Sequence, residues 1–156
     1  MAGQRQRGGV VVVGVDGSPS SRRALRWGLE QAEATGAKVV AVLAWQIPRH
    51  LGTAVMVMPG AQWDAEARNT LRSAVEPASA ARPQVEIEQR VVEGHPAEVL
   101  LREAGQADLL VVGNRGLGGF AGTVLGSVSQ HCVRHAPCPV VVVHDQTGTD
   151  PERNTG

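Results

Sequence analysis

Short, nearly continuous runs of apolar residues recur along this chain and constrain its fold more than any other feature. Four of them have the length of a strand and lie at residues 10–15, 38–45, 109–112 and 139–143. Strands without polar alternation are typical of a parallel sheet that is buried on both faces. A further strand is predicted at residues 85–92.

Helical periodicity fills the segments between these strands. The third such segment shows it most simply, because Ala97, Leu100, Leu101 and Ala104 are spaced as on one helix face. Helices are expected from Pro19 to Thr35, from Asp64 to near Pro77, over residues 97–104 and from Ser127 to His135. This alternation predicts an α/β fold, a Rossmann-like parallel sheet of five strands with helices on both faces and ligands at the carboxyl ends of the strands.

The length of 156 residues favours a single domain. We expect this domain at residues 10–146, with flexible polar tails at residues 1–9 and 147–156. A long connection over residues 46–63 contains two prolines and two glycines and is expected to serve a site or to move.

Charge and segment composition exclude several classes of partner. Lys plus Arg and Asp plus Glu number 15 each, so no net charge attracts nucleic acid or an anionic membrane. Residues 1–9 lack the apolar centre of a secretory signal, and no apolar run reaches membrane-spanning length. Cys132 and Cys138 are interpreted as reduced thiols, so we expect a cytoplasmic protein.

A glycine-rich segment follows the strand at residues 109–112. It reads Gly113-x2-Gly116-x9-Gly126-Ser127, and the next helix is expected to open at Ser127. Glycines let phosphate oxygens approach backbone N–H groups, and a helix N-terminus favours negative charge. Asp16 follows the first strand and should lie at the same edge of the sheet, so both loops are expected to share one ligand.

These two segments together resemble the universal stress protein family of the ATP-binding type. The resemblance rests on Val12-Val13-Gly14-Val15-Asp16-Gly17-Ser18 and on the glycine segment, with Gly94-x-Pro96 in support. It implies an adenine nucleotide alpha hydrolase-like sheet that binds ATP with magnesium. The implied role is regulation of a stress response or of dormancy. It also implies a homodimer formed through the last strand, from Pro139 to Val143.

Site residues follow from the resemblance by position in the motifs. Asp16 would contact the ribose or a magnesium ion, and Gly14, Val15 and Ala44 would line the base and sugar. The remaining cofactor-binding residues, around the phosphates and ribose, would be Val112, Gly113, Arg115, Gly116, Gly126, Ser127 and Val128.

Three other interpretations stay open. The glycines can serve turns and close packing, while Asp16 can be a turn or capping residue and Arg115 an exposed loop arginine. The fold can be a nucleotide-free dimeric scaffold. Gly116-x-Gly118-x-x-Ala121 also matches part of a dinucleotide fingerprint of an oxidoreductase, although no helix is expected to open directly after it.

Catalysis is not favoured by the sequence. The chain has no Gly-x4-Gly-Lys-Ser/Thr loop, and no paired carboxylates flank the glycine segment. Slow hydrolysis of bound ATP is the most activity expected. The choice among ATP, ADP and a cyclic nucleotide stays open, because a backbone-lined loop reads phosphate more sharply than base.

Overall fold

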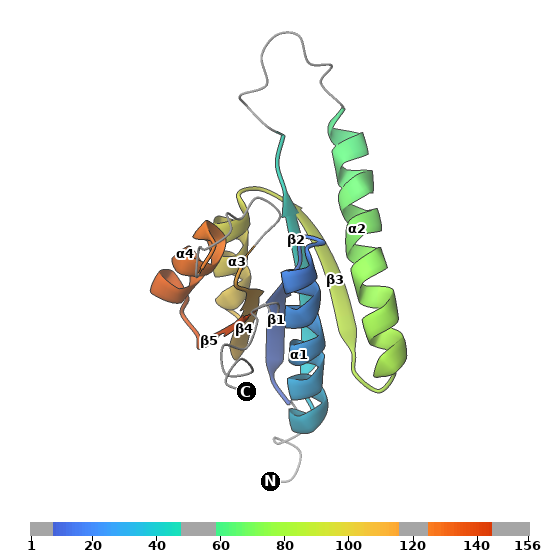
Figure 1. Cartoon of the computed structure of the whole chain (residues 1–156), viewed down its shortest axis with the longest axis vertical. Helices are drawn as coiled ribbons and strands as arrows, with labels where there is room; N and C mark the ends of the chain where they lie inside the picture. The colour runs from blue at the N-terminus through green and yellow to red at the C-terminus, as the bar shows by residue number, and fades with distance from the viewer. Residues whose placement is uncertain (1–7, 48–58, 116–124, 145–156) are drawn as a thin grey trace, which may run out of the picture.

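The computed structural model describes residues 8–47, 59–115 and 125–144 (Figure 1). Outside the described residues lie residues 1–7 of the expected N-terminal tail, all of the expected C-terminal tail and residues 48–58 of the 46–63 connection. The same holds for Gly116 and for Gly118 and Ala121 of the dinucleotide alternative. No helix within the described ranges is long and apolar enough to cross a membrane.

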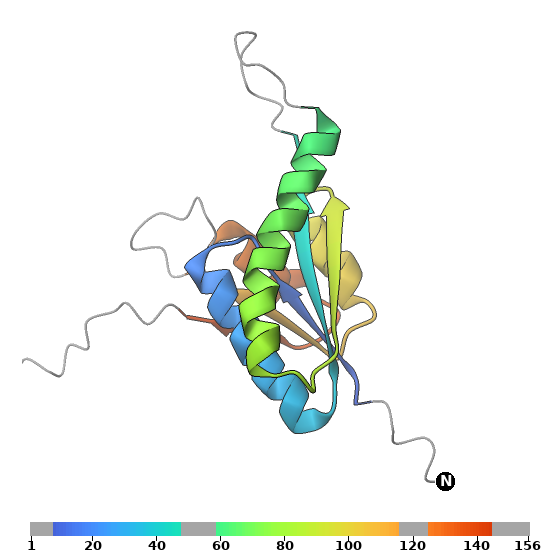
Figure 2. The ribbon, with the colours of Figure 1, turned by 90° about the vertical axis from the view of Figure 1, so that its right-hand side faces the viewer.

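Five parallel strands form one sheet in the order β3-β2-β1-β4-β5, which confirms the predicted fold class. The strands are β1 (Val10–Gly14), β2 (Lys38–Trp45), β3 (Ile87–Glu93), β4 (Leu109–Gly113) and β5 (Val140–Val143). The helices are α1 (Pro19–Thr35), α2 (Gly60–Ala81), α3 (Pro96–Ala104) and α4 (Ser127–His135). Helices α1 and α2 cover one face of the sheet, and α3 and α4 cover the other (Figures 1 and 2).

Two separate cores result from this layering, and the central strand β1 contributes to both. Val11 and Val13 face α1 and α2, where Leu25 and Leu71 are fully buried. Val12 faces α3 and α4. Alternate residues of a strand point to opposite faces, so a strand that packs on both sides needs apolar residues throughout.

Cys132 and Cys138 pack in or against the core on the α3 and α4 side, and both are free thiols. Cys132 is part of this core, and its exposed fraction is 0%. Burial raises the pKa of the Cys132 thiol to about 11. The thiol therefore stays protonated and unreactive at neutral pH.

The ends of α1 agree with the sequence signals. Ser18 caps the helix by accepting a hydrogen bond from the Ser21 N–H, Pro19 occupies the first turn, and Gly36 ends the helix in the left-handed region with φ 74°. Only residues that tolerate positive φ suit such a cap, and glycine does so without strain.

The predicted limits of the second helix were wrong. It starts at Gly60 and not at Asp64, and it continues past Pro77 to Ala81. Pro77 lacks the N–H that would bond one turn back, yet its position is exposed, where water can serve the carbonyl that is left over. The buried stripe of Leu71, Ala74, Val75 and Ala78 continues across the proline, so core packing outweighs its cost.

Candidate functional site

The candidate site lies where the chain leaves β1 and β4 at the carboxyl edge of the sheet. These two strands are neighbours, and the helices that follow them, α1 and α4, cover opposite faces. Such a reversal of the strand order opens a crevice in which α/β proteins bind ligands. The expectation that Asp16 and the glycine segment share this edge is confirmed for the described residues.

The β1–α1 loop is held by its own side chains. The Asp16 carboxylate accepts a hydrogen bond from the Ser18 N–H at 2.9 Å, and Ser21 Oγ accepts one from the Asp16 N–H at 3.2 Å. Gly17 adopts φ 87° between them. Asp16 therefore serves as a turn residue. A carboxylate has about four acceptor sites, so this bond does not by itself preclude a ligand.

Gly113, at the end of β4, lies against the first turn of α1. A Cβ atom at this position would lie 2.8 Å from the carbonyl carbon of Ser20 and 2.9 Å from its oxygen. The Gly113 carbonyl also accepts a hydrogen bond from Ser129 Oγ at 2.6 Å. Close packing of backbone on backbone thus requires glycine here, whatever the loop binds.

A buried hydrogen bond joins the first turn of α1 to the loop that follows β4. Ser20 Oγ donates to Asn114 Oδ1 at 2.9 Å and accepts from the Arg115 N–H at 3.4 Å. Ser20 and Asn114 are only 4% and 7% exposed. The Ser20 hydroxyl therefore fixes the spacing between the loops that follow β1 and β4.

Sequence reasoning missed Ser20 and Asn114. Ser20 reads as an ordinary residue of a first helical turn, and Asn114 stands at an unspecified position of the glycine pattern. The available signal was weak. Asn114 is a polar residue directly after an apolar strand, and several serines follow the first strand, which ends at the same edge of the sheet.

We expect Ser20→Ala to lower the free energy of unfolding by about 1–3 kcal/mol, because it leaves the buried Asn114 carbonyl oxygen without this donor. Urea denaturation measures the change. Ser73→Ala, at an exposed position of α2, is the control and should change stability by about 0.5 kcal/mol or less. Equal stability of the two variants would contradict a structural role for the Ser20 hydroxyl.

The N-terminus of α4 differs from that of α1. Gly126 is its N-cap and provides no side-chain cap, whereas α1 is capped by Ser18. The Gly126 N–H donates to the Asn114 carbonyl at 2.6 Å, which holds the start of α4 beside the end of β4. The first N–H groups of a helix need acceptors, and the partial positive charge there suits an anion.

The other predicted site residues fall into three groups. Arg115 and Ser127 lie at the edge, beside the end of β4 and at the start of α4. Gly14, Ala44 and Val112 lie at the ends of their strands on the α3 and α4 side, where a Cβ on Gly14 would lie 2.9 Å from Leu100 Cδ1. The side chains of Val15 and Val128 pack in or against the cores.

Comparisons with known proteins agree on one family. The sequence model described as the universal stress protein family matches residues 9–144. A universal stress protein from Mycolicibacterium smegmatis is 36% identical over 137 residues, which cover 85% of this chain and 45% of that protein. The chain thus spans about half the length of the curated relatives it matches.

Two solved structures of this family contain adenine nucleotides. A universal stress protein in complex with cAMP has a TM-score of 0.66 and 38% identity, covering 87% of this chain and 96% of its own. A universal stress protein family protein from Arabidopsis thaliana with AMP bound has a TM-score of 0.53 and 25% identity, covering 92% and 99%.

Proposed function

This chain belongs to the universal stress protein family, and we propose that it binds ATP with magnesium in the crevice between β1 and β4. Its cellular role would be that of a cytoplasmic regulator of a stress response or of dormancy, with nucleotide occupancy as the signal. The binding of cAMP and AMP by two relatives supports an adenine nucleotide as the class of ligand.

The start of α4 is the observation that carries this proposal. Its first turn has no side-chain cap, it begins beside Asn114 at the end of β4, and Arg115 adds a guanidinium at the same edge. The backbone N–H groups of Ser127 and Val128 would bind phosphate oxygens there. Gly14, Ala44 and Val112, near the ends of their strands, would lie beside the sugar and base.

Asp16 is the residue that fits magnesium. Its carboxylate supplies hard oxygen donors, which this ion prefers, and Asp16 follows β1 at the edge of the sheet where the neighbouring strand β4 also ends. A bound ion would offset part of the triphosphate charge. The Asp16–Ser18 turn would hold the carboxylate in one orientation, so that ion and phosphates meet a preformed edge.

The residues described at this edge are better suited to binding the nucleotide than to catalysing its hydrolysis. The Asp16 carboxylate is the acid group of the β1–α1 loop, and it would be occupied as a ligand. A general base has to lie within hydrogen-bond reach of the attacking water. We therefore propose hydrolysis that is slow at most.

Asp16→Asn tests the magnesium role without removing the turn, because the amide oxygen can still accept from the Ser18 N–H. We expect the affinity for magnesium-ATP to fall about tenfold or more, while affinity for ATP in the presence of EDTA changes little. Calorimetric titration of nucleotide-free protein measures both. Asp64→Asn removes the same charge from an exposed pair with Arg68 on α2 and is the matched control.

Two outcomes would count against the proposal. Equal affinity of Asp16→Asn and Asp64→Asn for magnesium-ATP would leave Asp16 as a turn residue only. The unmodified protein could also release no nucleotide when it is denatured and fail to bind added ATP. That result would favour the nucleotide-free scaffold.

We further propose a homodimer that forms through β5, because the two edges of the sheet differ. The β3 edge carries ion pairs between Lys38 and Glu88 at 3.1 Å and between Arg90 and Glu103 at 2.6 Å. Hydrogen bonds from Arg90, and then from Lys38, lower the pKa of Glu88 and keep it charged. Charged edge strands discourage pairing with another chain.

The β5 edge is apolar by contrast. All four valines of β5 are partly exposed, and Val133 of the neighbouring α4 is 50% exposed. The Leu110 N–H donates to the Pro139 carbonyl and the Asn114 N–H to the Val143 carbonyl. The N–H and C=O groups of successive strand residues point alternately to the two sides of the strand. Val140 and Val142 therefore direct theirs away from β4, where a partner strand could pair with them.

A further inference from the structure

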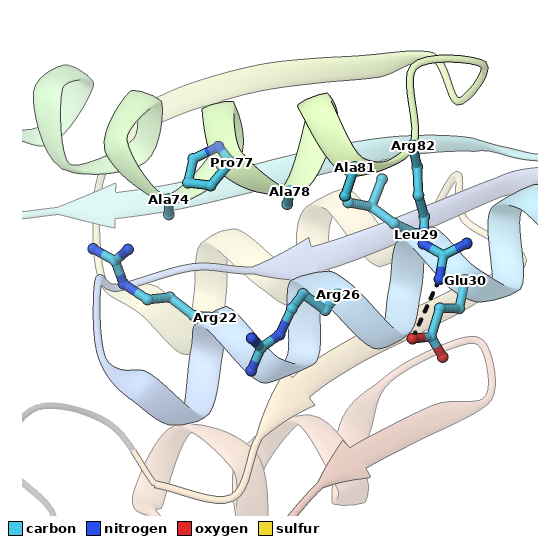
Figure 3. A pocket seen from close by; sticks show the side chains of 9 residues that line it. All are labelled: Arg22, Arg26, Leu29, Glu30, Ala74, Pro77, Ala78, Ala81 and Arg82. Atoms are coloured by element: carbon cyan, nitrogen blue, oxygen red, sulfur yellow. Dashed lines mark ion pairs between the residues drawn. The ribbon is translucent and has the colours of Figure 1, made fainter.

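A groove of about 360 Å³ runs between α1 and α2 (Figure 3). Its floor is apolar and consists of Leu29, Ala74 and Ala78, which are 1%, 4% and 9% exposed. Pro77 and Ala81 form the α2 rim and are exposed. The groove exists because alanines at three lining positions of α2 leave the space between two neighbouring helices unfilled.

Charge is distributed unevenly along the α1 rim. At one end Arg82 pairs with Glu30 at 3.5 Å and with Glu33 at 3.0 Å, so one guanidinium faces two carboxylates and this end is not cationic. At the other end stand Arg22 and Arg26, which are one helical turn apart and exposed.

The two arginines are available for a partner. Arg22 Nε donates to the Gly17 carbonyl at 3.3 Å, which orients the side chain without neutralising it. Within residues 8–47, 59–115 and 125–144, no ion pair links Arg22 or Arg26 to a carboxylate. One end of an apolar groove is therefore cationic.

We propose that this groove docks an amphipathic helix of a partner protein, one that carries an apolar stripe flanked by two acidic residues one turn apart. The apolar stripe would cover Leu29, Ala74 and Ala78, and the two carboxylates would pair with Arg22 and Arg26. From Arg22 to Glu30 the α1 rim spans about 12 Å at 1.5 Å per residue, which is the length of roughly two helical turns.

The shape favours a helix over a small ligand. Small-molecule sites enclose most of their ligand, whereas this groove is bordered by the exposed Pro77 and Ala81 along one side and by exposed arginines along the other. A helix in a groove binds through apolar anchors at helical spacing, and the flanking charges select its orientation.

The test is an amide NMR titration of the full chain with a synthetic amphipathic peptide of 18 residues. The probe carries leucines at i, i+3, i+7 and i+10, flanked by glutamates one turn apart, and a second peptide has lysines in place of these glutamates. We expect saturable shifts confined to the facing residues of α1 and α2 with the glutamate peptide, and none with the lysine peptide.

Charge-reversed variants locate the contact. Arg22→Glu/Arg26→Glu should weaken binding of the glutamate peptide at least tenfold. Arg102→Glu/Arg134→Glu makes the same change in net charge at exposed positions of α3 and α4, on the other face of the sheet, and should leave affinity unchanged. Well-dispersed spectra of both double variants establish that they are folded.

Several outcomes would overturn the proposal. The glutamate and lysine peptides could bind equally well, or the glutamate peptide could fail to bind. Its shifts could centre on residues outside α1 and α2, or Arg22→Glu/Arg26→Glu could bind it with full affinity. Shifts of the groove amides on dilution of the peptide-free protein would show that a second copy of this chain occupies the groove. Because nucleotide is not involved, failure here would leave the proposed ATP site untouched.

Discussion

Gly113→Val is expected to lower the free energy of unfolding by about 3 kcal/mol, as overpacking at a closed site does. The reason is the backbone of Ser20, whose carbonyl carbon lies 2.8 Å from the place that a Cβ would take. Backbone cannot turn aside as a flexible side chain can, so α1 and the end of β4 would have to separate. Urea denaturation with a two-state fit measures the loss.

Gly60→Ala is the control for this variant. Among the residues that the structure describes, a Cβ at Gly60 would meet only Trp45 Cη2, at the ordinary contact distance of 4.0 Å, and the position opens α2. We expect stability to stay level or to rise by about 0.4–1 kcal/mol. If Gly113→Val proved as stable as Gly60→Ala, the close approach of Gly113 and Ser20 would be wrong.

The same packing affects how nucleotide binding is tested. A Gly113 variant that loses ATP affinity would not identify Gly113 as a phosphate ligand, because the spacing of both loops would change with it. Asp16→Asn keeps the local hydrogen bond and changes only charge, so it is the more informative variant.

Val142→Pro is expected to convert the proposed dimer to a monomer. Val142 directs its N–H away from β4, and proline removes that donor and places its ring at the open edge. The bonds to β4 use Pro139 and Val143, so the protomer should keep its sheet. Light scattering coupled to size-exclusion chromatography reports the mass directly.

Val142→Thr is the matched variant, since threonine keeps both the N–H and the β-branched shape. It should remain dimeric at the protein concentration where Val142→Pro is monomeric. A dimer of unchanged stability in both variants would place the interface away from the edge of β5.

Most strands were predictable because their burial leaves a plain trace in the sequence. The valine runs of β1, β2, β4 and β5 pack on both faces, and such positions exclude polar residues. β3 was harder, since it lies at the edge and carries Glu88 and Arg90. It begins at Ile87 and not at Val85, which lies in the turn after α2.

Local patterns failed where distant contacts decide the structure. Proline usually ends a helix, but Pro77 is exposed within α2. The helix continues past it because the buried residues of α2 pack against the core on both sides of this position in the sequence. The Ser20–Asn114 hydrogen bond joins residues separated by 94 positions, and no periodicity encodes it. The sequence motifs identified the segments after β1 and β4. The Ser20 hydroxyl that connects them could be identified only from the folded structure.

The strand order also determines when this edge can exist during synthesis. β1 is made first and pairs with β2, but its other side receives β4 only after residue 113 has left the ribosome. Until then the central strand of the finished sheet has an unpaired side, and Ser20 lacks its partner Asn114. The edge between β1 and β4 therefore cannot form before β4 has been synthesised. Its contacts join distant segments, and such contacts are typical of slow folding. A nascent chain that stops at α3 would contain Asp16 and its turn but no crevice.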